Sequence, residues 1–237
     1  MKTKYLFLTV ISMLYGLTLK GQTLIVEQRQ VKSEESAALD SWTARLDQSV
    51  DFTMETYGDF VKELFKAKVD KRGKSMLVAE KILIPEISNL RLDQRALFAS
   101  ESGGTAISFT FSPGYDIHFG QEVYKAEFEK AQSFVKNFVR YHYKKFYNDQ
   151  IESLQSDIKS RQSDIESNGR KTDKNNKSIT SNKSEGETDK TKSKNEKMLR
   201  ENDSYTADTA AKRRQIADLE DQLAKANESL RRALDFK

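Results

Sequence analysis

The chain has 237 residues, of which 32% are charged and 37% hydrophobic, and it contains no cysteine. The lack of cysteine excludes disulfides, thiolate metal sites and a lipid anchor attached to an N-terminal cysteine. The net charge of +4 falls to +1 when the predicted signal peptide is removed, because that segment carries three lysines and no acidic residue. The overall charge therefore gives no basis for nucleic-acid binding, which requires a clear excess of Lys and Arg in a domain.

Residues 1–21 have the layout of a secretory signal peptide. Lys2 and Lys4 precede an apolar run from Tyr5 to Leu19, which is shorter than the roughly 20 residues that span a bilayer. We expect cleavage near Gly21 and an exported protein that resides in the periplasm or at the cell surface. An uncleaved N-terminal anchor is the alternative.

Residues 22–120 are predicted to form a small α+β head, beginning with a short strand or ordered lead-in at 24–31. A helix is predicted from there to Lys68, because apolar residues recur at spacings of three and four. These residues are Trp42, Leu46, Val50, Met54, Tyr57, Val61 and Leu64. A polar turn at 68–75 ends the predicted helix.

Strands are predicted at 76–84 and 95–100, and a third at 105–111, where apolar and polar residues alternate. The turn signal Ser112-Pro113-Gly114 follows, and the alternation resumes at Tyr115, Ile117 and Phe119. This pattern predicts a β-hairpin centred on the turn.

The stretch from Gly120 to Lys237 has no proline and few glycines, so a very long helix is expected. Its first part, 121–150, carries a broad apolar arc and is expected to pack on the head. The rest, 151–237, is a predicted coiled-coil arm with two apolar residues in seven. The seam residues are Ile151, Leu154, Ile158, Ile165, Ile216, Leu219, Leu223 and Leu230.

Residues 169–200 interrupt the seam and hold ten Lys or Arg against five acidic residues. We therefore predict a helical hairpin with a polar, basic tip near 184–187. In this register Ile151 faces residues 219–223, Ile158 lies near Ile216 and Phe138 meets Leu234. A parallel coiled coil between chains is the alternative.

The predicted fold class is α+β: a small, mostly antiparallel sheet covered by helices, with a long C-terminal helical hairpin or coiled coil. The candidate interaction surface consists of the lysines of the tip. They are Lys171, Lys174, Lys177, Lys183, Lys190, Lys192 and Lys194. A solvated or disordered loop is the simpler interpretation of this segment, and weak electrostatic contact with an anionic surface is the functional one.

No catalytic, cofactor or metal motif is recognised. Gly73-Lys74-Ser75 lacks the glycine that a phosphate-binding loop requires five positions earlier. His118 and His142 are the only histidines, and no metal-ligand spacing joins them. We expect no enzyme activity, no cofactor and no metal.

The order of segments resembles a group of uncharacterised exported bacterial proteins that have a small α+β head and a long C-terminal coiled-coil tail. The resemblance rests on the signal peptide, a helix, the strand ending at 82–88, the turn at 112–114 and the charged helical tail. It implies an exported protein and assigns no activity.

We expect a non-enzymatic envelope protein that acts as a structural or protein-interaction module through its coiled-coil arm. Its partners would be another protein or a second copy of itself, with weak anionic contact at the tip and no nucleic acid. The alternative is a ligand-binding or enzyme-accessory head whose pocket lies near Tyr115–Phe119.

Overall fold

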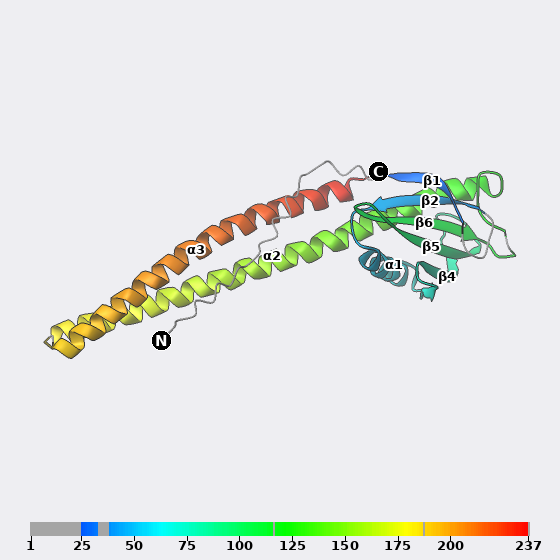
Figure 1. Cartoon of the computed structure of the whole chain (residues 1–237). Helices are drawn as coiled ribbons and strands as arrows, with labels where there is room; N and C mark the ends of the chain where they lie inside the picture. The colour runs from blue at the N-terminus through cyan, green and yellow to red at the C-terminus, as the bar shows by residue number, and fades with distance from the viewer. Residues whose placement is uncertain (1–24, 33–37, 116, 187, 237) are drawn as a thin grey trace, which may run out of the picture.

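The computed structural model describes residues 25–32, 38–115, 117–186 and 188–236, so the predicted signal peptide lies outside the described residues. The structure is α+β, with a six-stranded antiparallel sheet, a short helix and a long helical hairpin (Figure 1), which confirms the predicted fold class. The strands are β1 (Val26–Val31), β2 (Leu39–Leu46), β3 (Asp70–Arg72), β4 (Met76–Leu83), β5 (Arg91–Glu101) and β6 (Gly104–Ser112). The helices are α1 (Val50–Phe65), α2 (Lys125–Ser184) and α3 (Asp189–Leu234).

The sheet has the order β1-β2-β6-β5-β4-β3, and every neighbouring pair is antiparallel. The tight turn between β5 and β6 contains Gly103 at φ +92°. The next residue, Gly104, allows β2 to come close: a Cβ there would lie 2.0 Å from the carbonyl oxygen of Leu46. The absence of a side chain at Gly104 therefore lets the β5–β6 turn pack closely against β2, at the end of the sheet nearest the arm.

Aromatic side chains form the core between the sheet and the helices. Phe109 and Phe111 of β6 lie on the covered face, where Phe109 contacts Phe138 of α2 at a ring separation of 5.5 Å and Phe111 contacts Phe134 at 5.3 Å. Phe60 of α1 contacts Phe138 at 5.4 Å, so both helices share one layer. Edge-to-face arrangements dominate these contacts, as expected for packed rings.

The predicted helix is wrong in its first part, because α1 begins only at Val50. Trp42 and Leu46 belong to strand β2, where they lie on the covered face together with Ala44. A spacing of four residues returns to the same side of both a helix and a strand, so the apolar spacing does not distinguish the two. Ser49 marks the true start, since its side chain accepts a hydrogen bond from the backbone N–H of Phe52.

Two turn predictions also need correction. Residues 70–72 form the edge strand β3 within the segment predicted as a polar turn. The predicted hairpin centred on 112–114 forms only in part: the chain turns back after β6 with one isolated antiparallel bridge between Gly114 and Ile117, and the backbone N–H of Phe119 donates to the Phe111 carbonyl at 2.9 Å. The described residues 115 and 117–119 form no second strand. Tyr115 is 97% exposed, so it has none of the packing that would hold a strand on the sheet.

The long helix α2 joins the head to the arm without interruption. Its first part packs against the sheet, and the remainder leaves the head beside α3, which runs back toward the head (Figure 1). No helix among the described residues is long and apolar enough to cross a membrane.

Candidate functional site: the helical hairpin and its tip

The hairpin closes in a short turn between Ser184 and Asp189. Gly186 adopts φ +96°, a left-handed conformation that favours glycine. Thr188 then caps α3 in a reciprocal arrangement: its side chain accepts from the backbone N–H of Thr191, and the Thr191 hydroxyl accepts from the backbone N–H of Thr188. Local sequence thus stops α2 and restarts the chain as α3 in the opposite direction.

The predicted apolar seam lies between the two helices in the part of the hairpin nearer the head. All eight of its residues are half-buried: Ile151, Leu154, Ile158, Ile165, Ile216, Leu219, Leu223 and Leu230. Small residues of α3 fill the narrower positions, with Ala226 and Ala233 both buried. Burial is incomplete because two helices cover each other on one side only.

The seam continues through the tip as a row of polar contacts. Asn182 donates to Asn195 at 2.7 Å, and Asn175 donates to Asn202 at 3.0 Å. Lower down, Asn168 donates to the Asp208 carboxylate at 2.8 Å. These contacts satisfy amide groups that the partner helix covers, and they replace the apolar layers found nearer the head.

The expected interruption of the seam at 169–200 is therefore wrong, because polar residues continue it there. Three asparagines of α2 are spaced by seven, at 168, 175 and 182, and two of α3 are likewise spaced by seven, at 195 and 202. The seven-residue period therefore persists where hydrophobicity disappears. Isolated apolar layers at Ile179 and Met198, both buried, continue the same period.

The register differs from the predicted one by about five residues. Asn182 faces Asn195, Asn175 faces Asn202 and Asn168 lies beside Thr209, with side-chain contacts of 2.7, 3.0 and 3.5 Å. Continuing this register places Ile151 level with Ala226 instead of residues 219–223. In this register Ser184, the last residue of α2, lies level with residue 193, so the first turn of α3 extends beyond the end of α2.

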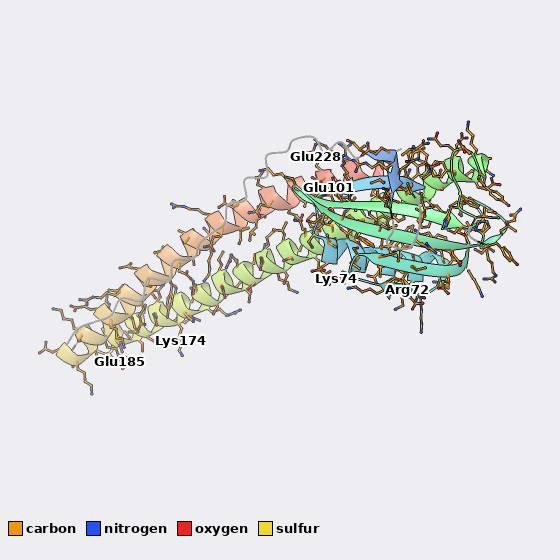
Figure 2. The ribbon with its side chains drawn as sticks, turned by 45° about the vertical axis from the view of Figure 1, so that its right-hand side comes forward. Arg72, Lys74, Glu101, Lys174, Glu185 and Glu228 are labelled. Carbon is orange, nitrogen blue, oxygen red and sulfur yellow. The ribbon has the colours of Figure 1, made fainter. Side chains whose placement is uncertain are left out.

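The lysines predicted as an interaction surface are all exposed: Lys171, Lys174, Lys177, Lys183, Lys190, Lys192 and Lys194. They come from both helices at the end of the hairpin farthest from the head. Figure 2 shows Lys174 and Glu185 toward the tip, and Glu228 at the opposite end of the arm, beside the head. The Lys171 ammonium lies over the Tyr205 ring, 5.3 Å from its centre, and so spans the two helices.

Below the tip, Lys212 links the helices through two carboxylates. Its ammonium lies 2.7 Å from Asp208 of its own helix and 3.3 Å from Asp164 of α2. The hydrogen bond to Asp208 is the main cause that raises the pKa of Lys212, and the same contact lowers the pKa of Asp208. This lysine is therefore engaged within the hairpin.

The base of the hairpin is attached to the head at two points. Arg140 of α2 donates to the carbonyl oxygen of Phe236 at 2.7 Å, and Ala233 is buried in the core. His142 is fully buried, with Nδ1 at 2.7 Å from the Thr56 hydroxyl and Nε2 at 2.8 Å from the Gln48 side-chain oxygen. These contacts fix α2 against α1 and the end of β2.

A second candidate site is a cavity of about 520 Å³ at the end of the sheet opposite the arm. Its lining residues from the segment before α2 include His118, Phe119 and Gln121. The Asp40 carboxylate accepts a hydrogen bond from the backbone N–H of Gln121 at 3.0 Å, which ties that segment to β2. Of the segment predicted to border a pocket, the exposed Tyr115 lies outside the lining.

The described parts of the head and the hairpin offer no recognisable metal centre. Within the described residues, no group of three or more His, Asp or Glu side chains is placed to hold an ion. No protein-family model, curated protein sequence or solved structure matches the chain.

Proposed function

We propose that the protein is a non-enzymatic structural or protein-interaction module of the cell envelope that acts through its helical arm. One observation carries the proposal: α2 is a single 60-residue helix whose first part belongs to the core of the head. Because one end of this continuous helix is packed in the head, the helix fixes the position of the tip relative to the head. The tip is thus held at a defined distance from the head.

The composition of the tip supports a contact role. Its seam consists largely of hydrogen-bonded asparagines, which give less stability than apolar layers but favour a single pairing of the two helices. Its outer surface carries exposed lysines with few acidic partners. These features fit a surface that is kept extended and available for binding.

The predicted signal peptide supports a location in the cell envelope. The arm would act as a spacer or an interaction surface, either for another protein or for a second copy of the chain. This proposal assigns no reaction to the head, whose covered face is filled by packed aromatic residues.

Site-specific photo-crosslinking in the full chain tests the proposal. A photoreactive residue would replace the exposed Lys177 on the arm or the exposed Lys74 on the β3–β4 turn, and adducts would be collected in intact cells. We expect discrete adducts from the arm position and few from the turn. Adducts that form only from the head would contradict a role for the arm.

The cavity near His118 favours a second candidate, a ligand-binding or enzyme-accessory head. Its lining includes polar groups that can bind a small molecule, among them Gln28, Arg29 and Asp40. A thermal-shift screen of the full chain against small polar metabolites tests this alternative. Stabilisation that is lost in Arg29→Ala would favour it over the arm.

A further inference from the structure

The charged residues of the tip are sorted by side of the hairpin. Asp164 and Asp208 both contact Lys212, so they lie on the same side of the seam. Residues a multiple of seven away repeat that side: Lys171 on α2 follows Asp164 by seven, and Lys194 on α3 precedes Asp208 by fourteen. Lys171 and Lys194 therefore share one side although they come from different helices.

Three further lysines lie on this side, because helix residues three or four apart are neighbours on one face. Lys174 is three residues from Lys171, and Lys190 and Lys197 are four and three residues from Lys194. We call the set the basic face: Lys171, Lys174, Lys190, Lys194 and Lys197. All five are exposed. Two acidic residues of the tip share this side by the same rule: Glu201, which lies 4.0 Å from Lys197, and Glu185, which follows Lys171 by fourteen at the end of α2.

The other side of the tip has a different charge. Asn176, which accepts a hydrogen bond from Asn202, marks this side on α2, and Lys183 follows Asn176 by seven residues. Lys192 lies two residues from Lys194, about 200° around α3, so it falls on the side away from the basic face. Four acidic residues accompany these two lysines: Asp173, Asp189, Glu196 and Asp203. The positive charge of the tip is thus concentrated on one side.

The basic face is long. Lys190 lies next to the turn, and Lys171 lies about 16 residues farther down the hairpin in the observed register, which corresponds to about 24 Å at 1.5 Å per residue. Lysine ammonium groups act as mobile point charges and impose no fixed bidentate geometry on their partner.

We propose that the basic face docks flat on the surface of an anionic phospholipid bilayer. A planar array of negative headgroups meets all five lysines of the basic face at once, whereas a single linear polyanion would follow only part of a band that crosses from α3 to α2. The face carries no large apolar residue, so the hairpin rests on the headgroups and does not insert. This inference names the partner of the arm and rests on the proposed function.

Binding of this kind is additive and sensitive to salt. Each lysine near an anionic membrane contributes about 1 kcal/mol, and the attraction falls off within a Debye length. Removing two lysines from the basic face is therefore expected to weaken binding by roughly tenfold or more.

The test compares two variants of the full chain that carry the same change in charge. Lys174→Gln with Lys194→Gln alters the basic face, and Lys183→Gln with Lys192→Gln alters the opposite side. Binding at low salt is measured by flotation with vesicles that contain phosphatidylglycerol and phosphatidylcholine in a ratio of about 3:7. Circular dichroism of each variant verifies that the helices are retained.

We expect the basic-face variant to lose roughly tenfold or more in affinity and the control to stay within about twofold of the original chain. Equal losses in the two variants would overturn the assignment to one side. Absence of binding to anionic vesicles at low salt, or retention on heparin alone, would overturn the choice of a membrane. If crosslinking still occurs from the arm under those outcomes, the module function stands and only its lipid partner is rejected.

Discussion

The side chain of Asn182 donates to the side chain of Asn195 at 2.7 Å, close to the turn of the hairpin, and Asn195 is only 3% exposed. A buried amide pair satisfies its own hydrogen bonds only when the two helices are aligned in one register. The pair therefore selects that register at some cost in stability, as single buried asparagines do in helical assemblies.

Replacing both members of this pair with leucine should stabilise the tip but weaken its specificity. In Asn182→Leu with Asn195→Leu, an apolar layer replaces a polar one, so the free energy of unfolding should rise by about 1–2 kcal/mol. The same change should allow other pairings, including association between chains. Chemical denaturation and light scattering after size-exclusion chromatography measure the two effects.

Asn227→Leu is a suitable control for that experiment. Asn227 is exposed and its side chain bonds only to the Leu223 carbonyl of its own helix, at 2.8 Å. Its replacement should leave both stability and oligomeric state nearly unchanged. A double-leucine variant that is less stable and still monodisperse would contradict a register role for the asparagines.

The apolar part of the hairpin could be predicted from the sequence, whereas its polar part and its exact register could not. Apolar residues at coiled-coil spacing, such as Leu154 and Leu223, predict the seam and with it the hairpin. Asn175 and Asn202 occupy the same seam, but asparagine is also typical of loops and turns. Only the seven-residue repeat of asparagine marks it, and the exact register depends on the turn, which has no strong pattern of its own.

Two glycine-to-alanine substitutions should have opposite effects. At Gly104 a Cβ would lie 2.0 Å from a backbone carbonyl oxygen, so Gly104→Ala must displace β2 and should destabilise the head by about 3 kcal/mol or more. Gly169 lies within α2 with open space around it, and Gly169→Ala should stabilise the chain by about 0.5–1 kcal/mol. Urea denaturation of both variants checks the pair, and equal effects would contradict the tight approach at Gly104.

Stability should fall as the pH drops below neutrality because of His142. Burial lowers the pKa of this histidine from 6.5 to about 3 in the folded chain. Above pH 6.5 the side chain is neutral in both states and has no effect. Between those two values the unfolded chain binds a proton that the folded chain excludes, so the free energy of unfolding decreases by up to about 1.4 kcal/mol per pH unit.

Substitution of His142 separates this effect from general acid denaturation. His142→Gln should show a shallower loss of stability between pH 6.5 and 4.5, a window that lies below the ordinary pKa of histidine. Identical slopes in the variant and the original chain, measured by urea denaturation at several pH values, would argue against a neutral, buried His142.

The end of α3 should be essential for closing the base of the arm. Ala233 is buried in the core, so Ala233→Asp places a carboxylate among apolar groups and should detach the last turns of α3. Ala224→Asp, at an exposed position of the same helix, is the matched control. Hydrogen exchange should increase near the C-terminus in the first variant only; unchanged protection there would contradict the contact.

The head shows a second limit of sequence interpretation. The strand β6 was recognisable because Ile107 and Phe109 alternate with polar residues, whereas Trp42 and Leu46 fit either a helix or a strand. Alternation also did not determine whether the segment that begins at Tyr115 forms a strand, because a strand must pair with a neighbour that has free backbone groups. Long-range pairing, which local spacing does not encode, determined both outcomes.

The central claim is that α2 and α3 of one chain form an antiparallel hairpin that returns to the head. The chain has no cysteine, so spin labels can be attached at Ser163→Cys and Arg214→Cys, which are exposed and level with each other in the observed register. Electron–electron distance measurement, with an excess of unlabelled protein, should give a single separation of about 20–30 Å, from an interaxial distance of about 10 Å plus two outward labels. A distance of about 75 Å, expected for one straight helix over this span, or a signal lost on dilution with unlabelled chains, would contradict the hairpin.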